Sequence, residues 1–164
     1  MKNTLLALVS IMIVSVGSTY AQGNIDTKKY KFEMAIPEGF NFKLTENDDY
    51  SVIEGYNEAT DTKIKAYAFM GESYSRESIV DFAVTETGIK GDSWEKVNDG
   101  IDENGFAWWD IYEAEVGDKV LYGVVAKNAF NDTRYLFFAL ATPESYEANQ
   151  EQYVEWAVSC QGVK

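Results

Sequence analysis

Three stretches in the second half of the chain decide the fold: GFAWWDIYEAE at 105–115, KVLYGVVAKNAF at 119–130 and TRYLFFALA at 133–141. Each is rich in aromatic and β-branched residues, which favour strands. The dipeptides GD (117–118) and ND (131–132) separate them, and connections this short join neighbouring strands as hairpins. The pattern predicts an antiparallel sheet built around these three strands.

Two-residue turns would also set the register, with Trp109 opposite Ala126 and Trp108 opposite Lys127. The first face of the sheet would then carry Trp109, Ile111, Tyr122, Val124, Ala126, Phe137 and Ala139, and the second would carry Phe106, Trp108, Asp110, Tyr112, Val125, Lys127, Leu136, Phe138 and Leu140. A sheet with one face in water alternates apolar and polar residues, and these strands do not. Both faces must therefore be covered.

The segments on either side supply the rest of the fold. Four further strands are predicted before the first helix, over 29–36, 40–44, 50–56 and 62–70, and one follows it near WEKVN at 94–98. Ser75 is a predicted N-cap with Gly88 as the stop of one helix, and Thr142 with Pro143 begins a second helix that we expect to run to Gly162. We therefore predict an α+β fold, an antiparallel β-sheet with helices packed on both faces in the order β-β-β-β-α-β-β-β-β-α. An open two-layer sheet is the alternative.

This layout resembles the PsbP-like fold. The resemblance rests on the order of the elements, on FEMAIPEGF at 32–40, on the aromatic-rich strand that follows ENG at 103–105, and on the closing amphipathic helix. The fold is shared by the extrinsic photosystem II subunit, a Ran-binding nuclear import factor and several bacterial secreted families. The resemblance implies a binding or accessory protein that docks onto a larger assembly, and it carries no functional residue across.

The N-terminus predicts secretion. Lys2 precedes the apolar stretch LLALVSIMIVSVG at 5–17, and Thr19 and Ala21 place small residues where a signal peptidase cuts. We expect a signal peptide over 1–21, a flexible polar arm over 22–28 and a single PsbP-like domain over 29–164, located in a periplasm or outside the cell. A retained transmembrane helix is the alternative, but the stretch is shorter than the roughly 20 residues that span a bilayer.

The amino-acid composition excludes several kinds of catalytic and metal site. The chain has no His and a single Cys, Cys160, which excludes His-based catalysis, His-ligated zinc and an intramolecular disulfide. Cys160 falls on the apolar stripe of the last helix and reads as a core residue. The net charge of −13 argues against nucleic acid and anionic lipid as partners. We predict no cofactor, no metal site and no membrane insertion after removal of the signal peptide.

Two other functions remain open at this point. A carboxylate-based hydrolase such as a glycosidase needs only two acids beside a cleft, and the chain has 27 acidic residues. A calcium-stabilised ligand-binding module could use the oxygen-rich segments ENDD at 46–49 and NDGIDENG at 98–105. Asn, Asp and Gly also form turns without binding any metal. Of the four tryptophans, Trp94 is the least committed to the core by pattern.

The residues around Asp110 form the one candidate site. In the predicted register Lys127 lies opposite Trp108 and diagonal to Asp110, and Arg134 belongs to the same face. One interpretation is structural, with Lys127 as the cation that balances Asp110. The other is a small ligand-binding pocket of Trp108, Asp110, Lys127 and Arg134 that receives a polar group from a partner.

The sequence therefore favours a protein that is not an enzyme. We expect a secreted, non-catalytic binding or accessory domain that docks onto an envelope or extracellular component, with an unidentified protein as its partner.

Overall fold

The computed structural model describes residues 24–27, 30, 32–35, 38–103 and 105–162. The predicted signal peptide over 1–21 and its cleavage point lie outside these residues. Within the described part of the chain, no helix is long and apolar enough to cross a membrane.

The strands are β1 (Asn24–Thr27), β2 (Phe32–Ala35), β3 (Asn41–Glu46), β4 (Tyr50–Asn57), β5 (Thr62–Met70), β6 (Glu95–Glu103), β7 (Phe106–Val116), β8 (Lys119–Asn128), β9 (Thr133–Ala141) and β10 (Gln161–Gly162). The helices are α1 (Arg76–Thr87) and α2 (Pro143–Ser159), with a short 3-10 turn at Gly91–Ser93. Seven strands form one antiparallel sheet in the order β3-β4-β5-β9-β8-β7-β6. The predicted α+β class with a large antiparallel sheet is confirmed.

The order of elements differs from the prediction at both ends of the described chain. β1 lies in the segment predicted to be a polar arm, and β10 begins where the last helix was predicted to continue to Gly162. Both pair with β2, one on each side, to make a separate three-stranded sheet. In this sheet the backbone hydrogen bonds of each short strand are made to a segment far away in sequence. A local sequence pattern therefore cannot predict these strands.

The predicted helix starts are confirmed by their caps. The Ser75 hydroxyl accepts a hydrogen bond from the Ser78 backbone N–H at 3.1 Å, and the Thr142 hydroxyl accepts one from the Ser145 N–H at 3.2 Å. Gly88 ends α1 with a φ of 70°, in the left-handed region that glycine adopts without a steric cost.

The predicted register of β7 and β8 is also confirmed, with Trp109 opposite Ala126 and Trp108 opposite Lys127. The connection from β8 to β9 is longer than a two-residue turn, and Lys127 faces Arg134. This moves the register by two residues, an even number, so the residues of β9 keep their predicted faces.

Phe106 is an exception. A bulge between Phe106 and Trp108 adds one residue to β7 and reverses the side on which Phe106 lies. Phe106 belongs to the cluster on the same side as Trp109, not to the face that carries Trp108.

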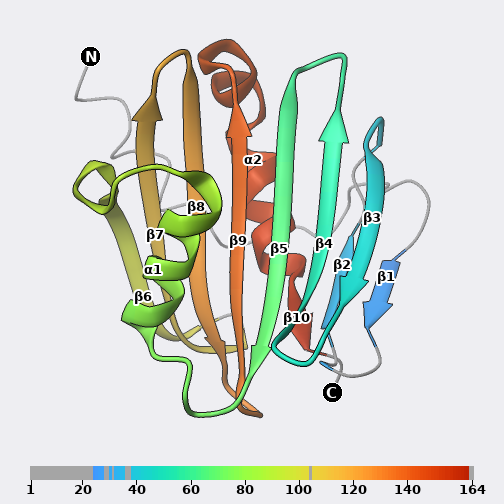
Figure 1. Cartoon of the computed structure of the whole chain (residues 1–164), viewed down its shortest axis with the longest axis vertical. Helices are drawn as coiled ribbons and strands as arrows, with labels where there is room; N and C mark the ends of the chain where they lie inside the picture. Colours follow the sequence, from blue (N-terminus) through green and yellow to red (C-terminus); the bar gives the residue numbers. More distant parts are fainter. Residues whose placement is uncertain (1–23, 28–29, 31, 36–37, 104, 163–164) are drawn as a thin grey trace.

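The two helices lie on opposite sides of the seven-stranded sheet, with α1 in front and α2 behind in the view of Figure 1. We call the corresponding surfaces the α1 face and the α2 face. On the α1 face Ile79 and Ala83 of the helix belong to one hydrophobic cluster with Leu121, Val125 and Leu136 of the sheet.

A second cluster fills the α2 face, where Tyr153 and Trp156 of the helix join Tyr122 and Phe137 of the sheet. Cys160 is 1% exposed within this cluster, as predicted for a core residue, and burial raises the pKa of its thiol. The thiol therefore stays protonated at neutral pH and is not a nucleophile.

Candidate functional site

Asp110 is buried on the α1 face of β7, with 1% of its surface exposed. A buried carboxylate is costly unless it is paired and hydrogen-bonded. Nη1 of Arg76 donates to Oδ1 at 3.3 Å, Nζ of Lys96 lies 3.6 Å from the same oxygen, and the Tyr112 hydroxyl donates to Oδ2 at 3.3 Å. Both oxygens of Asp110 thus contact a described partner, and the arrangement is that of a structural ion cluster.

Arg76 comes to this cluster from the first residue of α1. Its guanidinium also lies over the Trp108 ring, 4.2 Å from the centroid, in a cation–π contact. A cation at a helix N-terminus opposes the helix macrodipole. Arg76 is therefore placed for its contacts with the sheet, where Asp110 balances its charge.

A second ionic contact holds the other end of α1. Glu86, in the last turn, accepts a hydrogen bond from the Tyr67 hydroxyl at 2.6 Å and another from Nζ of Lys65 at 3.1 Å. Lys65 also pairs with Glu54 of the neighbouring strand at 2.8 Å. An acid in the last turn again opposes the macrodipole, so both charged ends of α1 serve its attachment to the sheet.

These contacts shift the pKa values of the groups involved. Burial, followed by the charge of Asp110, raises the pKa of Tyr112 to about 12, so its hydroxyl remains a donor at neutral pH. The hydrogen bond from Tyr67 lowers the pKa of Glu86 despite partial burial, and Lys65 contributes in the same direction.

The four predicted site residues do not all contact one another. Trp108 and Asp110 belong to the ion cluster, but the cations that contact Asp110 are Arg76 and Lys96 rather than the predicted Lys127. Among the described residues, no ion pair joins Lys127 to any carboxylate.

Arg134 points elsewhere, because its Nη1 donates to the backbone oxygens of Gly71 and Asp132, each at 2.8 Å. It thereby holds the connection between β5 and α1 against the start of β9. The balancing cations Arg76 and Lys96 were both missed, although a cation such as Arg76 at the first helical position was a signal that could have indicated a tertiary partner.

Asp99 lies directly opposite Asp110 across β6 and β7. Lys96 lies between the two carboxylates, 3.5 Å from Asp99 and 3.6 Å from Asp110. Like charges directly opposite each other destabilise a strand pair, and the shared cation offsets this repulsion. The pair is therefore accounted for by its salt bridges, and the enclosure of Asp110 does not provide the open cleft between two acids that glycoside hydrolysis needs.

The segment predicted as a possible calcium loop, NDGIDENG, is not a loop over most of its length. Residues 98–103 belong to strand β6 and pair with β7. No group of three or more acidic or Cys side chains suited to a metal ion occurs in the described part of the chain.

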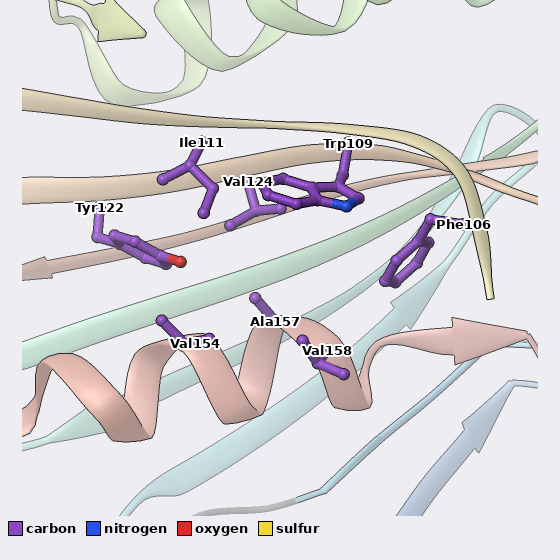
Figure 2. Close-up of a pocket in the computed structure, with 8 residues that line it drawn as sticks. All are labelled: Phe106, Trp109, Ile111, Tyr122, Val124, Val154, Ala157 and Val158. Atoms are coloured by element: carbon purple, nitrogen blue, oxygen red, sulfur yellow. The ribbon is translucent and has the colours of Figure 1, made fainter. Parts of the chain in front are cut away.

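A small cavity of about 20 Å³ lies on the α2 face, between α2 and strands β7 and β8 (Figure 2). Its walls are side chains from both layers: Phe106, Trp109, Ile111, Tyr122, Val124, Val154, Ala157 and Val158. Within the described residues, Nε1 of Trp109 and the hydroxyl of Tyr122 have no hydrogen-bond partner. The cavity has room for about one water molecule, far below the roughly 300 Å³ of a substrate pocket.

Trp94 corrects the prediction about the tryptophans. It is 8% exposed, packs edge-on against Tyr112 with the ring centroids 6.0 Å apart, and belongs to the cluster on the α1 face. Trp108 is the half-buried one of the four. Trp108, and not Trp94, is therefore the tryptophan that solvent or a partner can reach.

The sequence and the structure were compared with those of known proteins, and only the structures gave matches. Neither a family model nor a curated protein matches the sequence. The solution structure of cyanobacterial PsbP (CyanoP) from Synechocystis superposes with a TM-score of 0.60 and 12% identity, covering 94% of this chain and 99% of that one. The chain has a PsbP-like fold.

Two further solved structures resemble this chain less closely than CyanoP does. The Ran-binding protein Mog1p of Saccharomyces cerevisiae gives a TM-score of 0.46 at 11% identity, with 80% of this chain and 82% of that one covered. A protein of Bacteroides thetaiotaomicron gives 0.45 at 14% identity over 82% of this chain, which spans 46% of that protein. The fold assignment rests on the CyanoP structure, and at 12% identity that comparison establishes the fold alone.

Proposed function

We propose that the protein is a secreted, non-catalytic binding or accessory domain that docks onto a protein of the cell envelope or exterior. The observation that carries the proposal is the exposure of large apolar side chains at one corner of the sheet. Ile101 of the edge strand β6 is 70% exposed, and Phe130 of the connection between β8 and β9 is 72% exposed. We call Val97, Ile101 and Phe130 the docking edge.

A backbone contact brings Phe130 toward the end of β6 that carries Ile101, and Val97 lies earlier on the same strand. Val97 and Ile101 lie on β6, at the edge of the seven-stranded sheet. The Ala129 N–H, next to Phe130, donates to the Gly105 carbonyl at 3.0 Å, which holds the β8–β9 connection against the turn that follows β6. Exposed apolar residues that gather in this way mark interaction surfaces in soluble proteins.

The edge strand itself also suits docking. An edge strand offers backbone groups that another chain can bind, and proteins usually protect such an edge with charges and bulges. β6 has both, with a bulge between Lys96 and Asn98 and acids along its length. Ile101 is nevertheless left in water, which supports a role for this strand in contact with a partner.

The fold and the N-terminal sequence give the proposal further support. The PsbP-like fold supports an accessory role because the resemblance implies docking onto a larger assembly. Secretion is supported by the N-terminal sequence, where Lys2 and an apolar stretch precede the predicted cleavage after Ala21.

Site-specific photocrosslinking in the producing cells tests the proposal. A photoreactive amino acid is placed at position 101 or 130 on the docking edge and, as a control, at the exposed position 43 on the opposite edge strand β3. We expect one discrete protein adduct from positions 101 and 130 that is absent from position 43. Equal adducts from all three positions, or none from 101 and 130, would contradict docking through this edge.

A further inference from the structure

Lys127 and Arg134 form a pair of like charges on neighbouring strands. They are direct partners in the register of β8 and β9, and both lie on the α1 face. Side chains in such a pair have their Cβ atoms roughly 5 Å apart, and like charges there destabilise the sheet. No carboxylate of the described residues forms an ion pair with either cation, although the chain has 27 acids and 14 basic residues. The lack of a counter-charge at this pair is therefore not a consequence of composition.

Arg134 makes the imbalance sharper because it is 8% exposed. Its Nη1 donates hydrogen bonds to the backbone oxygens of Gly71 and Asp132, which accept them but carry no net charge to neutralise the guanidinium. A buried charge without a counter-charge is destabilising. Asp110 on the same face shows the contrast, since each of its oxygens meets a donor and two cations lie near it.

An apolar shelf adjoins this pair. Trp108 lies opposite Lys127 on the β7 side, and Ile101 lies opposite Trp108 on β6. Ile101, Trp108, Lys127 and Arg134 therefore form one row across four adjacent strands of the α1 face, which we call the cationic row. Its outer end, Ile101, belongs to the docking edge and is exposed, while Trp108 and Lys127 are half-buried.

We propose that the cationic row binds a carboxylate that the docking partner presents beside an apolar side chain, as in an acidic and hydrophobic protein segment. The carboxylate would supply the counter-charge for Lys127 and Arg134, and the apolar side chain would pack against Ile101 and the part of Trp108 that Arg76 leaves exposed. The inference rests on the proposed docking function and names the chemistry of the partner. Charge complementarity selects this occupant, because an apolar segment alone would leave both cations unbalanced and a basic segment would add to them.

Three small probes test the site directly in the full domain. Phenylacetate carries a carboxylate on an apolar ring, phenylacetamide is its neutral counterpart, and inorganic phosphate is the anion alone. In a titration followed by backbone amide NMR, we expect phenylacetate to bind with a Kd in the low millimolar range, ~1–5 mM, and to shift the signals of Ile101, Trp108, Lys127 and Arg134. Phenylacetamide and phosphate should each bind at least about fivefold more weakly. Equal binding of phenylacetate and phenylacetamide, or no shift at the row, would overturn the proposal.

The variant Lys127→Gln has a matched control in Lys63→Gln. Lys63 is exposed on the same face, near the start of β5, whereas Arg134 lies opposite Phe69 near the end of that strand. We expect Lys127→Gln to weaken phenylacetate binding about five- to tenfold and Lys63→Gln to leave it unchanged. Because Lys127→Gln also removes the repulsion from Arg134, its Tm should rise by about 1–3 °C relative to Lys63→Gln. Equal effects of the two variants on binding would count against the site, and a lower Tm for Lys127→Gln would show that the lysine is there for stability.

The crosslinking assay separates this inference from the docking proposal. With the photoreactive group at position 130, Lys127→Gln should reduce the partner adduct severalfold, whereas Lys63→Gln should not. An undiminished adduct would leave docking standing and overturn the cationic row as the place where the partner binds. If phenylacetate still binds in that case, the row is a site for a small carboxylate and not for a protein segment.

Discussion

The two helices are attached to the sheet in different ways. α1 carries charged side chains at both ends that reach the sheet, Arg76 to Asp110 and Glu86 to Tyr67 and Lys65. α2 packs mainly through aromatic side chains, and four polar atoms of the buried aromatic residues in its layer have no hydrogen-bond partner within the described residues: Nε1 of Trp109, the hydroxyl of Tyr122, the hydroxyl of Tyr153 and Nε1 of Trp156. In the α1 layer, Nε1 of Trp94 is the one such aromatic atom among the described residues.

The difference shows which physical effect dominates on each side. A buried aromatic side chain removes about 150–250 Å² from water, which is about 4–6 kcal/mol at 25 cal/mol per Å². An unpartnered polar tip costs about 1–3 kcal/mol, so burial prevails in the α2 layer. In the α1 layer, polar contacts select where the helix lies, and this layer should be the one that responds to charge and pH.

Trp156→Ala should give the largest loss of stability. Trp156 is 2% exposed, and its ring lies 5.5 Å from those of Phe40 and Tyr153. Removing it should lower the free energy of unfolding by about 3–5 kcal/mol, as for other buried aromatic residues. Equilibrium urea unfolding measures the change, and a loss below about 1 kcal/mol would mean that aromatic burial does not dominate this layer.

Asp110→Asn should have a smaller effect. The variant keeps the shape of the side chain but removes the charge that Arg76 and Lys96 balance, and these two cations are 35% and 43% exposed, so water can solvate them. We expect a loss of about 1–3 kcal/mol in the same urea experiment. A double-mutant cycle with Arg76→Gln measures the coupling energy between Asp110 and Arg76. A coupling energy near zero would show that this ion pair does not help to attach α1 to the sheet.

Gly100→Ala tests the close packing of Trp109 on the edge strand. A Cβ atom at Gly100 would lie 2.5 Å from Cε2 and Cζ2 of the Trp109 ring, so the ring would have to move. We expect a loss of about 1–2 kcal/mol and a change in the indole signal of Trp109 in NMR. The neighbouring Asn98→Ala, on the same strand and face, serves as the control, and equal losses for both variants would argue against ring contact as the cause.

The smallest effect should come from acid, and it should act on α1 first. The folded-state pKa of Glu86 is lowered, so its contribution to stability is complete above the unfolded value of 4.5 and is lost as the pH falls through the folded value. Hydrogen exchange of α1 amides should therefore accelerate below about pH 4, before that of α2 amides. Glu86→Gln should abolish this difference, and acceleration in α2 first would reverse the comparison between the layers.

Local sequence patterns predicted the elements that depend on local chemistry. The caps at Ser75 and Thr142 and the register from Trp109 to Ala126 follow from turn and cap residues within a few positions. β1 and β10 were missed because their pairing with β2 joins segments at the two ends of the described chain. The predicted face of Phe106 was wrong because a single bulge residue reverses every side chain beyond it.

The candidate site was predicted only in part, for the same reason. Trp108, Asp110 and Lys127 were placed on one face from the strand register, as the structure has them. One of the two cations beside Asp110, Arg76, comes from α1, 34 positions away in sequence, and the sheet register cannot show where a helix lies on it. The other, Lys96, lies on β6 beside a bulge that shifts the register. A carboxylate in an apolar strand indicated that a cation would be near, but not which one.

Photocrosslinking at positions 101 and 43 in the producing cells tests the central claim most directly, because these two exposed positions lie on opposite edges of one sheet. We expect a discrete partner adduct at position 101 that is severalfold stronger than any adduct at position 43. An adduct at position 43 of equal or greater yield would show that the partner does not dock on the edge that carries Ile101.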